Sequence, residues 1–452
     1  MLPMLSLWPW QFWQTAQQLI EPSTAGWPLG AARQKSIYRP LLEDSAPELI
    51  YRHPGLAAWL LSDHLLVADF PLKYLRLYNP SASALWLLLI KGQLDRNGLI
   101  AAYAEVFKLP LHQASTDVMA CLSEWAALGW LDNHGAGCLR IDPKPVTESL
   151  ADSATDRAQI PAHRVLLDDV FQLGATTFAV RVGELDGTDL SPSANSTLAA
   201  RISAMLSGFP AARTTATTSR PQLLVVVAPD VTYIDDGTAL SIKDDAVDAL
   251  GQVILAVFRM AYPQEQMLAT LHAAAVGQRG TLLLSGVSGA GKSTLASYLF
   301  SKGWAYYGDD IVGLNAKGEV LSFPASASIK EGSWSALRSS FPQLEVLQSM
   351  SAGLKTVRYL PLSGEATADA PARKVAAWVF PRYVAQAQTR FEAMDAIEAL
   401  QSLIGSGFSL DGQYGYQGVG QFVSLLTGAP RYRLLYSDLK EAEECLQSLL
   451  TP

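Results

Sequence analysis

Residues 281–299, TLLLSGVSGAGKSTLASYL, constrain the fold of this chain more than any other stretch. The apolar run Leu282-Leu283-Leu284 is typical of a buried strand, and apolar residues return at helical spacing farther along. Between them, glycines allow positive φ angles and a close approach of the backbone to a ligand. The first N–H groups of a helix are unpaired, so a loop that leads directly into a helix can bind an anion. We therefore predict a strand, an anion-binding loop and a helix.

The loop ends in Lys292-Ser293, which completes the pattern G-x-x-x-x-G-K-S of a Walker A motif. We expect Lys292 to bridge the β- and γ-phosphates of ATP and the Ser293 hydroxyl to hold Mg²⁺. The alternative is a glycine-rich turn that binds nothing, but the full pattern lies between a strand and a helix, as the motif requires. The predicted nucleotide contacts are Gly286, Ser288, Gly289, Ala290, Gly291, Lys292, Ser293 and Thr294.

Length and composition exclude several classes of protein. At 452 residues the chain is long for one core, so two or three domains are expected. A formal net charge of −8 provides no polycationic surface for nucleic acid or an anionic membrane. Cys121, Cys138 and Cys445 lack C-x-x-C spacing, which argues against disulfides and zinc and fits a reducing cytoplasm. No run of eighteen apolar residues occurs, so no membrane-spanning helix is expected.

Residues 1–44 are predicted to be an N-terminal extension. They contain Trp8, Trp10 and Trp13 but neither the basic start nor the cleavage site of a signal peptide. The aromatic side chains either pack on the body of the protein or form a segment that docks on a membrane surface or a partner.

Residues 45–133 are predicted to form a small α+β domain of the winged-helix type, with strands followed by three short helices. The last helix of such a domain commonly reads DNA. Residues 112–130 contain no Lys or Arg, however, so this helix cannot supply the phosphate contacts that dominate DNA affinity. The predicted strands cover residues 57–61, 64–69 and 72–77, and the predicted helices cover residues 81–92, 95–107 and 115–128.

The order of these features resembles the PqqD family, with YNPSASALWLLLIKGQ after the strands and LSEWAALGWLD at the end. The resemblance implies that the domain binds the leader of a ribosomally made precursor peptide and delivers it to a modifying enzyme. The strand from Leu72 to Leu77 is the last one before the helices, and we expect its open edge to accept the leader as a further strand. A purely structural role is the alternative.

Residues 134–163 are rich in Pro, Ser, Asp and Ala and are predicted to be a linker. The second domain, residues 164–452, contains the Walker A loop. Shortly after the helix of this loop, a short strand ends in Asp309-Asp310. In a doubly wound sheet, the carboxyl end of that strand lies beside the phosphate loop.

His272 before the loop strand, the loop itself and Asp309-Asp310 after the next helix together resemble the HPr kinase/phosphorylase family. The resemblance implies an α/β P-loop domain in which Asp309 is the general base, His272 its partner and Asp310 a support for the metal. The segment ASIKEG resembles a lysine motif of HPr kinase-related proteins that accompany PqqD-like domains. It implies that Lys330 neutralises the moving phosphoryl group and that Glu331 approaches the metal.

Each of these assignments has an alternative. His272 could be a core histidine on an apolar helix, the two acids a solvated turn, and Lys330-Glu331 a surface ion pair. Arg382, at a strand end, could reach the nucleotide or form a structural ion pair. Residues 411–420 are rich in glycine and are predicted to be a mobile loop. The Glu-Ile/Leu-Arg-Gly part of the HPr kinase signature has no counterpart in this sequence.

The sequence thus favours a two-domain cytoplasmic kinase that uses ATP and Mg²⁺ to phosphorylate a hydroxyl of a captured precursor peptide, with serine as the acceptor by family analogy alone. Two alternatives stay open. One is a peptide chaperone whose nucleotide site only gates capture or release. The other is a small-metabolite kinase with the N-terminal domain as a scaffold. Assembly into a homo-oligomer is also left open.

Overall fold

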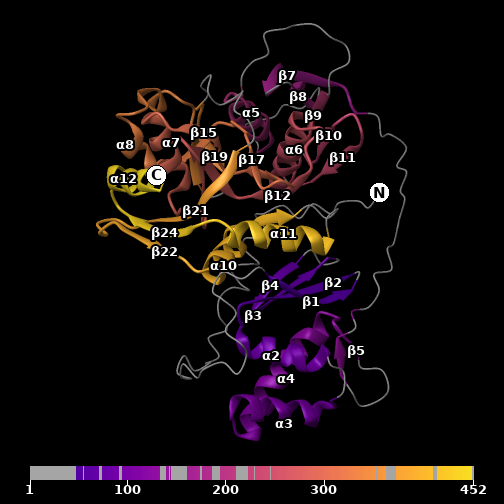
Figure 1. Cartoon of the computed structure of the whole chain (residues 1–452). Coiled ribbons are helices and arrows are strands. Elements are labelled where there is room, and N and C mark those ends of the chain that lie inside the picture. The colour runs from indigo at the N-terminus through magenta and orange to yellow at the C-terminus, as the bar shows by residue number, and fades with distance from the viewer. Residues whose placement is uncertain are drawn as a thin grey trace.

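The predicted extension and most of the predicted linker lie outside the residues that the structure describes. The computed structural model describes residues 47–53, 55–70, 74–90, 94–132, 139–141, 143, 160–173, 176–185, 194–209, 222–228, 230–244, 246–352, 355–362, 373–410 and 415–449. Among these residues, no helix is both long and apolar enough to cross a bilayer. Figure 1 shows the arrangement of the elements.

The N-terminal unit begins with a four-stranded antiparallel sheet, β1 (Glu48–His53), β2 (Leu56–Leu61), β3 (His64–Asp69) and β4 (Tyr74–Tyr78), in that order. The sequence predicted only three strands. It missed β1, whose ELIYRH side chains are largely exposed or half-buried, so no apolar run marks the strand. β4 begins at Tyr74, and the predicted strand residues Leu72 and Lys73 lie outside the described part.

Three helices cover one face of this sheet: α2 (Pro80–Ile90), α3 (Arg96–Phe107) and α4 (Leu111–Ala127). The side chain of Asn79 accepts a hydrogen bond from Ala82 N at the start of α2, and that of Asp95 caps α3. Trp86, Trp125 and Trp130 are fully buried and pack edge to face between helices and sheet. The unit ends with the short pair β5 (Leu131–Asp132) and β6 (Arg140–Ile141).

The second face of the same sheet packs against α11 (Gly415–Thr427), so in Figure 1 strands β1 to β4 lie between α11 and the helices α2 to α4. The Arg52 guanidinium lies 4.2 Å from the centre of the Tyr416 ring. The prediction of a mobile loop is wrong for residues 415–420, which form the start of α11. Buried residues at helical spacing, including Val419, Phe422 and Val423, anchor this helix.

A second unit contains a five-stranded sheet in the order β11-β10-β9-β8-β7, with α5 and α6 in the same core. β8 and β9 run parallel, and the other neighbours are antiparallel. The elements are β7 (His163–Leu173), β8 (Thr176–Leu185), α5 (Ala194–Leu206), β9 (Gln222–Val227), β10 (Thr232–Asp235), β11 (Leu240–Lys243) and α6 (Ala246–Ala261).

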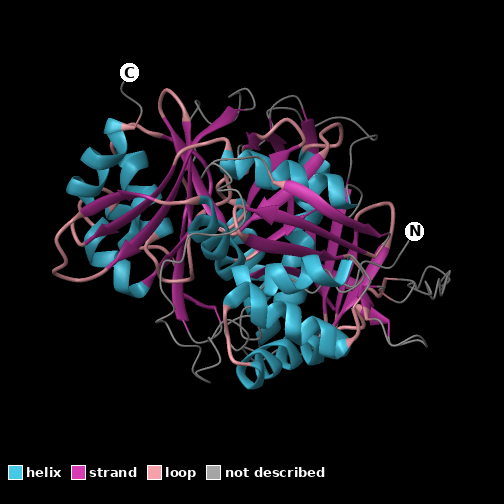
Figure 2. Cartoon of the chain, turned by 60° about the horizontal axis from the view of Figure 1, so that its bottom comes forward, coloured by secondary structure: helices cyan, strands magenta, loops and turns pink. Residues whose placement is uncertain are grey.

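The remaining chain is built on a ten-stranded sheet, which Figure 2 shows with helices on both sides. The sheet is mixed and not the parallel doubly wound sheet expected, because among its described strands only β14, β21 and β24 run parallel to one another as direct neighbours. Its elements are β12 (Met267–Leu271), β13 (Ala273–Gly277), β14 (Thr281–Ser285), α7 (Lys292–Ser301), β15 (Ala305–Gly308), β16 (Val312–Asn315), β17 (Glu319–Leu321), β21 (Arg373–Tyr383), β22 (Arg390–Ala393), α10 (Ala396–Ser406), β23 (Phe408–Leu410), β24 (Arg431–Tyr436) and α12 (Leu439–Ser448).

A separate three-stranded sheet has the order β18-β20-β19. Its strands are β18 (Ala327–Lys330), β19 (Met350–Ala352) and β20 (Lys355–Leu360). Three short helical turns, η1 (Glu331–Ser333), α8 (Trp334–Leu337) and η2 (Pro342–Glu345), connect β18 to β19. This small sheet carries two lysines that face the site described next.

Candidate functional site

The predicted strand and helix flank the glycine-rich segment as expected: β14 precedes it and α7 begins at Lys292. We call residues Gly286 to Ser293 the glycine loop. Gly291 has φ 96°, and a Cβ atom there would overlap the Tyr436 hydroxyl, so this position requires glycine. Tyr436 OH donates to Gly291 O over 3.2 Å, and Tyr383 N donates to Ala290 O over 3.0 Å. Two strands of the sheet thus hold the loop in place.

Lys292 lies almost wholly inside the protein, with 5% of its surface exposed. Its Nζ folds back over the loop and donates to Gly286 O at 2.6 Å. Burial lowers the pKa of Lys292 to about 8, although Asp310 and Asp309 favour its charged form. A buried ammonium held mainly by a neutral carbonyl would gain from an anion in the loop.

Asp309 follows β15, whose carboxyl end lies on the same edge of the sheet as the glycine loop because β13 is antiparallel to both β14 and β15. The predicted juxtaposition is therefore present. Asp309 is 5% exposed, and neither carboxylate oxygen has a hydrogen-bond partner of ordinary geometry among the described residues. Burial, followed by repulsion from Asp310, raises the pKa of Asp309 to about 7, although the nearby Ser293 hydroxyl opposes the shift.

This buried acid makes the stability of the protein depend on pH. Folding raises the pKa of Asp309, so as the pH rises the unfolded chain loses this proton before the folded protein does. The free energy of unfolding therefore decreases from about pH 4, and the decrease is complete above about pH 7. We expect Asp309→Asn to increase the free energy of unfolding by about 1–3 kcal/mol at pH 8 and to change it little at pH 4. Denaturant titrations at the two pH values measure this. An equal effect at both would contradict it, and Asp230→Asn, at an exposed position outside the site, is the control.

Asp310 lines the open side of the site, with φ 63° and 51% of its side chain exposed. Desolvation by the surrounding chain still raises the pKa of this carboxyl, while Lys292, Lys330 and Arg201 oppose the shift. His272 Nε2 lies 4.0 Å from Asp310 Oδ1, and Asp310 is the residue next to Asp309, the expected partner of this histidine.

His272 lies between β12 and β13, so the helix assumed in the alternative of a core histidine is wrong. Residues on both sides of it alternate between two buried faces of the sheet, which favours strands. Burial and then Lys292, Lys330 and Lys355 hold the pKa of His272 well below its usual value. The imidazole is therefore neutral at pH 7.

Lys330 and Lys355 both point at the glycine loop, and their Nζ atoms lie 2.9 Å and 3.1 Å from Ser288 Oγ. Lys330 is opposite Val357 in the sheet, and Lys355 is two residues from Val357, so both lysines share one face. Burial and then Lys355 lower the pKa of Lys330. Two cations thus converge on one uncharged hydroxyl. The sequence missed Lys355 because it belongs to no motif.

The other predicted residues are less closely joined to this cluster. Glu331 is exposed at the start of η1, directly after Lys330, and Ser333 Oγ in the same turn accepts a hydrogen bond from Thr294 Oγ1 at 2.7 Å. Arg382 is exposed near the end of β21. Among the contacts of the described residues, none joins Glu331 or Arg382 to Ser293 or to the two acids.

The oxygen donors beside the glycine loop match what Mg²⁺ needs when it binds together with a nucleotide. Among the described residues, no group of three or more His, Cys, Asp and Glu is arranged to hold a metal ion. Mg²⁺ bound with a nucleotide needs only one or two carboxylates, because phosphate oxygens and water complete its shell. Asp309, with two unpaired buried oxygens near Ser293, and the more exposed Asp310 fit this requirement.

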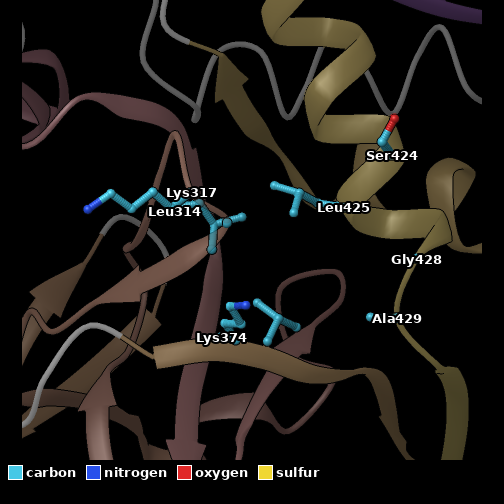
Figure 3. A pocket seen from close by; sticks show the side chains of 9 residues that line it. Leu314, Lys317, Lys374, Ser424, Leu425, Gly428 and Ala429 are labelled. Atoms are coloured by element: carbon cyan, nitrogen blue, oxygen red, sulfur yellow. The ribbon is translucent and has the colours of Figure 1, made fainter.

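A separate surface pocket lies between the β16–β17 turn, the start of β21 and the end of α11 (Figure 3). Among the described residues that line it, Lys317 and Lys374 are the charged ones. The pocket shares no lining residue with the glycine loop. It is lined by Leu314, Lys317, Gly318, Lys374, Val375, Ser424, Leu425, Gly428 and Ala429.

Comparison of the chain with models of known protein families and with curated proteins finds no match, so the family resemblances rest on the motif residues alone.

Proposed function

We propose that this protein is a cytoplasmic, ATP-dependent kinase that phosphorylates a hydroxyl group of a peptide captured by its N-terminal unit. The observation that carries the proposal is the convergence of Lys292, Lys330 and Lys355 on one glycine loop beside two carboxylates. The three positive charges outnumber the two negative charges that Asp309 and Asp310 can carry. The excess is larger when Asp309 is neutral, which burial favours. A polyphosphate would balance the excess.

The residues divide into three roles. Lys292 exchanges its bond with Gly286 O for the β- and γ-phosphates, and Lys330 and Lys355 contact the terminal phosphate. Asp309, with a pKa near 7, takes the proton of the acceptor hydroxyl. The hydroxyl oxygen then bonds to the γ-phosphorus, the bond to the bridging oxygen breaks, and ADP leaves.

Ser293 and Asp310 are the residues that would hold Mg²⁺, which supplies charge neutralisation on the phosphates. Serine stays the favoured acceptor by family analogy alone. His272 is a neutral imidazole beside Asp310, so it adds no further positive charge next to that carboxylate.

For the peptide, we propose strand addition at the edge of β4, which pairs with β3 alone among the described strands. Phe70 N donates to Gly55 O, so this pair of residues is hydrogen-bonded in the ladder between β2 and β3. Hydrogen-bonded and non-hydrogen-bonded pairs alternate along an antiparallel ladder. The even-numbered residues of β3 therefore bond to β2, and the odd-numbered residues bond to β4. Arg76, which is opposite Val67, therefore directs its N–H inward. The N–H groups that face the open edge belong to Leu75 and Leu77.

The wall of this edge is more polar than the sequence suggested. Arg76 Nη1 lies 2.5 Å from Glu124 of α4, and Tyr78 OH donates to the same carboxylate at 3.0 Å.

A proline in place of Leu77 removes an N–H group that faces the open edge of β4. We expect Leu77→Pro to bind the leader about 3- to 10-fold more weakly than Leu77→Ala, which also loses the leucine side chain but keeps the N–H. Titration of a leader peptide against both full-length variants measures this. Equal affinities would exclude this edge.

Transfer of labelled phosphate tests the function as a whole. The protein is incubated with γ-labelled ATP, Mg²⁺ and a candidate precursor peptide, and label on the peptide supports the kinase. Label released only as inorganic phosphate, at a rate that the peptide changes, would instead support a nucleotide-gated chaperone. Label on a small metabolite but never on a peptide would support a metabolite kinase with a scaffolding N-terminal unit.

A further inference from the structure

One aromatic ring beside the glycine loop is open to solvent. Among the aromatic residues whose side chains the structure describes, Tyr383 alone is exposed, with 51% of its surface accessible. Val384, the next residue, is exposed as well. An aromatic side chain has a large apolar area and gains from being covered, so an open ring at a candidate binding site is available to a ligand.

The backbone on both sides of this ring is fixed. Tyr383 N donates to Ala290 O at 3.0 Å, and Val384 N donates to Tyr436 O at 3.0 Å. The ring packs edge to face on the Tyr436 ring, with 5.8 Å between the ring centres. Tyr436 in turn donates its hydroxyl hydrogen to Gly291 O. The exposed ring of Tyr383 is therefore held against the glycine loop by two strands.

The ring lies at the end of the glycine loop where α7 begins. A Cβ atom at Gly291, directly before α7, would lie 3.3 Å from the Cβ atom of Tyr383. Lys330 and Lys355 contact the loop at Ser288, nearer its other end, and they are the residues proposed for the terminal phosphate. A nucleotide whose phosphates follow the loop from Ser288 toward α7 would therefore place its sugar and base on the side of Tyr383.

We propose that the ring of Tyr383 stacks on the purine base of the bound nucleotide. This proposal rests on the proposed function and adds the base to the phosphate contacts given above. β21 and β24 run parallel to β14, so Tyr383 and Tyr436 lie at the carboxyl edge of these strands, where ligands of parallel sheets bind. Every base has a flat π face, and a purine has the larger one, so the ring favours purines without distinguishing adenine from guanine.

The test compares two ligands that share the phosphates and differ in the base. Binding of MgADP and of magnesium pyrophosphate to the full-length protein is measured by calorimetry. We expect Tyr383→Ala to weaken the binding of MgADP about 3- to 30-fold and to change the binding of pyrophosphate less than about twofold. Tyr383→Phe keeps the ring and should bind MgADP like the wild-type protein. MgGDP should lose as much affinity as MgADP in Tyr383→Ala.

Tyr233→Ala is the control, because Tyr233 is a half-buried tyrosine of β10 in the second unit, and it should bind both ligands like the wild-type protein. Unchanged MgADP affinity in Tyr383→Ala would overturn this inference and leave the loop as a phosphate site. An equal loss for MgADP and pyrophosphate would also overturn it, because the ring would then only support the loop. If the wild-type protein binds neither ligand, the proposed function fails and the inference with it.

Discussion

Replacement of Lys292 by methionine is expected to abolish phosphoryl transfer, with a loss of at least about 10³-fold in kcat/KM. Methionine keeps an unbranched apolar stem in a site that is only 5% exposed, but it removes the buried charge. The neighbouring Lys330 and Lys355 cannot replace it, because both reach the loop at Ser288, whereas Lys292 Nζ lies over Gly286 O. We therefore expect a folded protein without activity.

Label transfer from γ-labelled ATP to the peptide measures the loss, and titration of the leader measures capture. Capture should be unchanged, because the N-terminal unit has its own buried core around Trp86 and Trp125. Lys317→Met serves as the control, since Lys317 lines the pocket of Figure 3 and lies apart from the glycine loop. Full transfer by Lys292→Met would contradict the assignment of the loop as a nucleotide site.

The parts of the site that the sequence predicted are those encoded within a few neighbouring residues. The glycine loop lies between β14 and α7, and Asp309 follows the next strand, so chain connectivity alone brings them together. The order of strands could not be foreseen in the same way. β12 and β13 are short, and the three consecutive alanines of β13 fit a helix as well as a strand, which explains the helix in the alternative given for His272.

Residues that reach the site from a distance left no local pattern. Lys355 faces Ser288 only because the register of β18 and β20 places it on the face that carries Lys330. Pairing between segments so far apart depends on packing of the whole chain, which a single sequence does not display.

The N-terminal unit shows the same limit. Its three helices were predicted from local residues close to their observed bounds. The contact between its sheet and α11 was not, because apolar residues on both faces of β2 and β3 fit an internal core as well as a surface that docks on another unit. His272 N of the candidate site donates to Gly407 O, and β23 and then α11 follow Gly407 in the chain. The helix that contacts the N-terminal sheet is therefore joined to the candidate site.

Replacement of Asp309 by asparagine is expected to slow the chemical step by about 10²- to 10⁴-fold while nucleotide still binds. Asparagine has nearly the same shape but cannot take the proton of the acceptor hydroxyl. Single-turnover transfer of label measures the chemical step, and retention of MgADP measures binding. Asp310→Asn should instead raise the Mg²⁺ concentration needed for half-maximal rate. If Asp310→Asn stops the reaction and Asp309→Asn is harmless, the roles of the two acids are reversed.

The pH dependence distinguishes a base from a carboxylate that only attracts the metal. A base is active in its deprotonated form, so kcat/KM of the wild-type protein should rise with pH through about 7, where Asp309 titrates in the free protein. It should fall again above about 8, where Lys292 loses its proton and with it the charge that binds the phosphates. Asp309→Asn should lose the rise and keep the fall. A variant that keeps the full bell-shaped profile would exclude Asp309 as the base, because the group that titrates near pH 7 would then lie elsewhere.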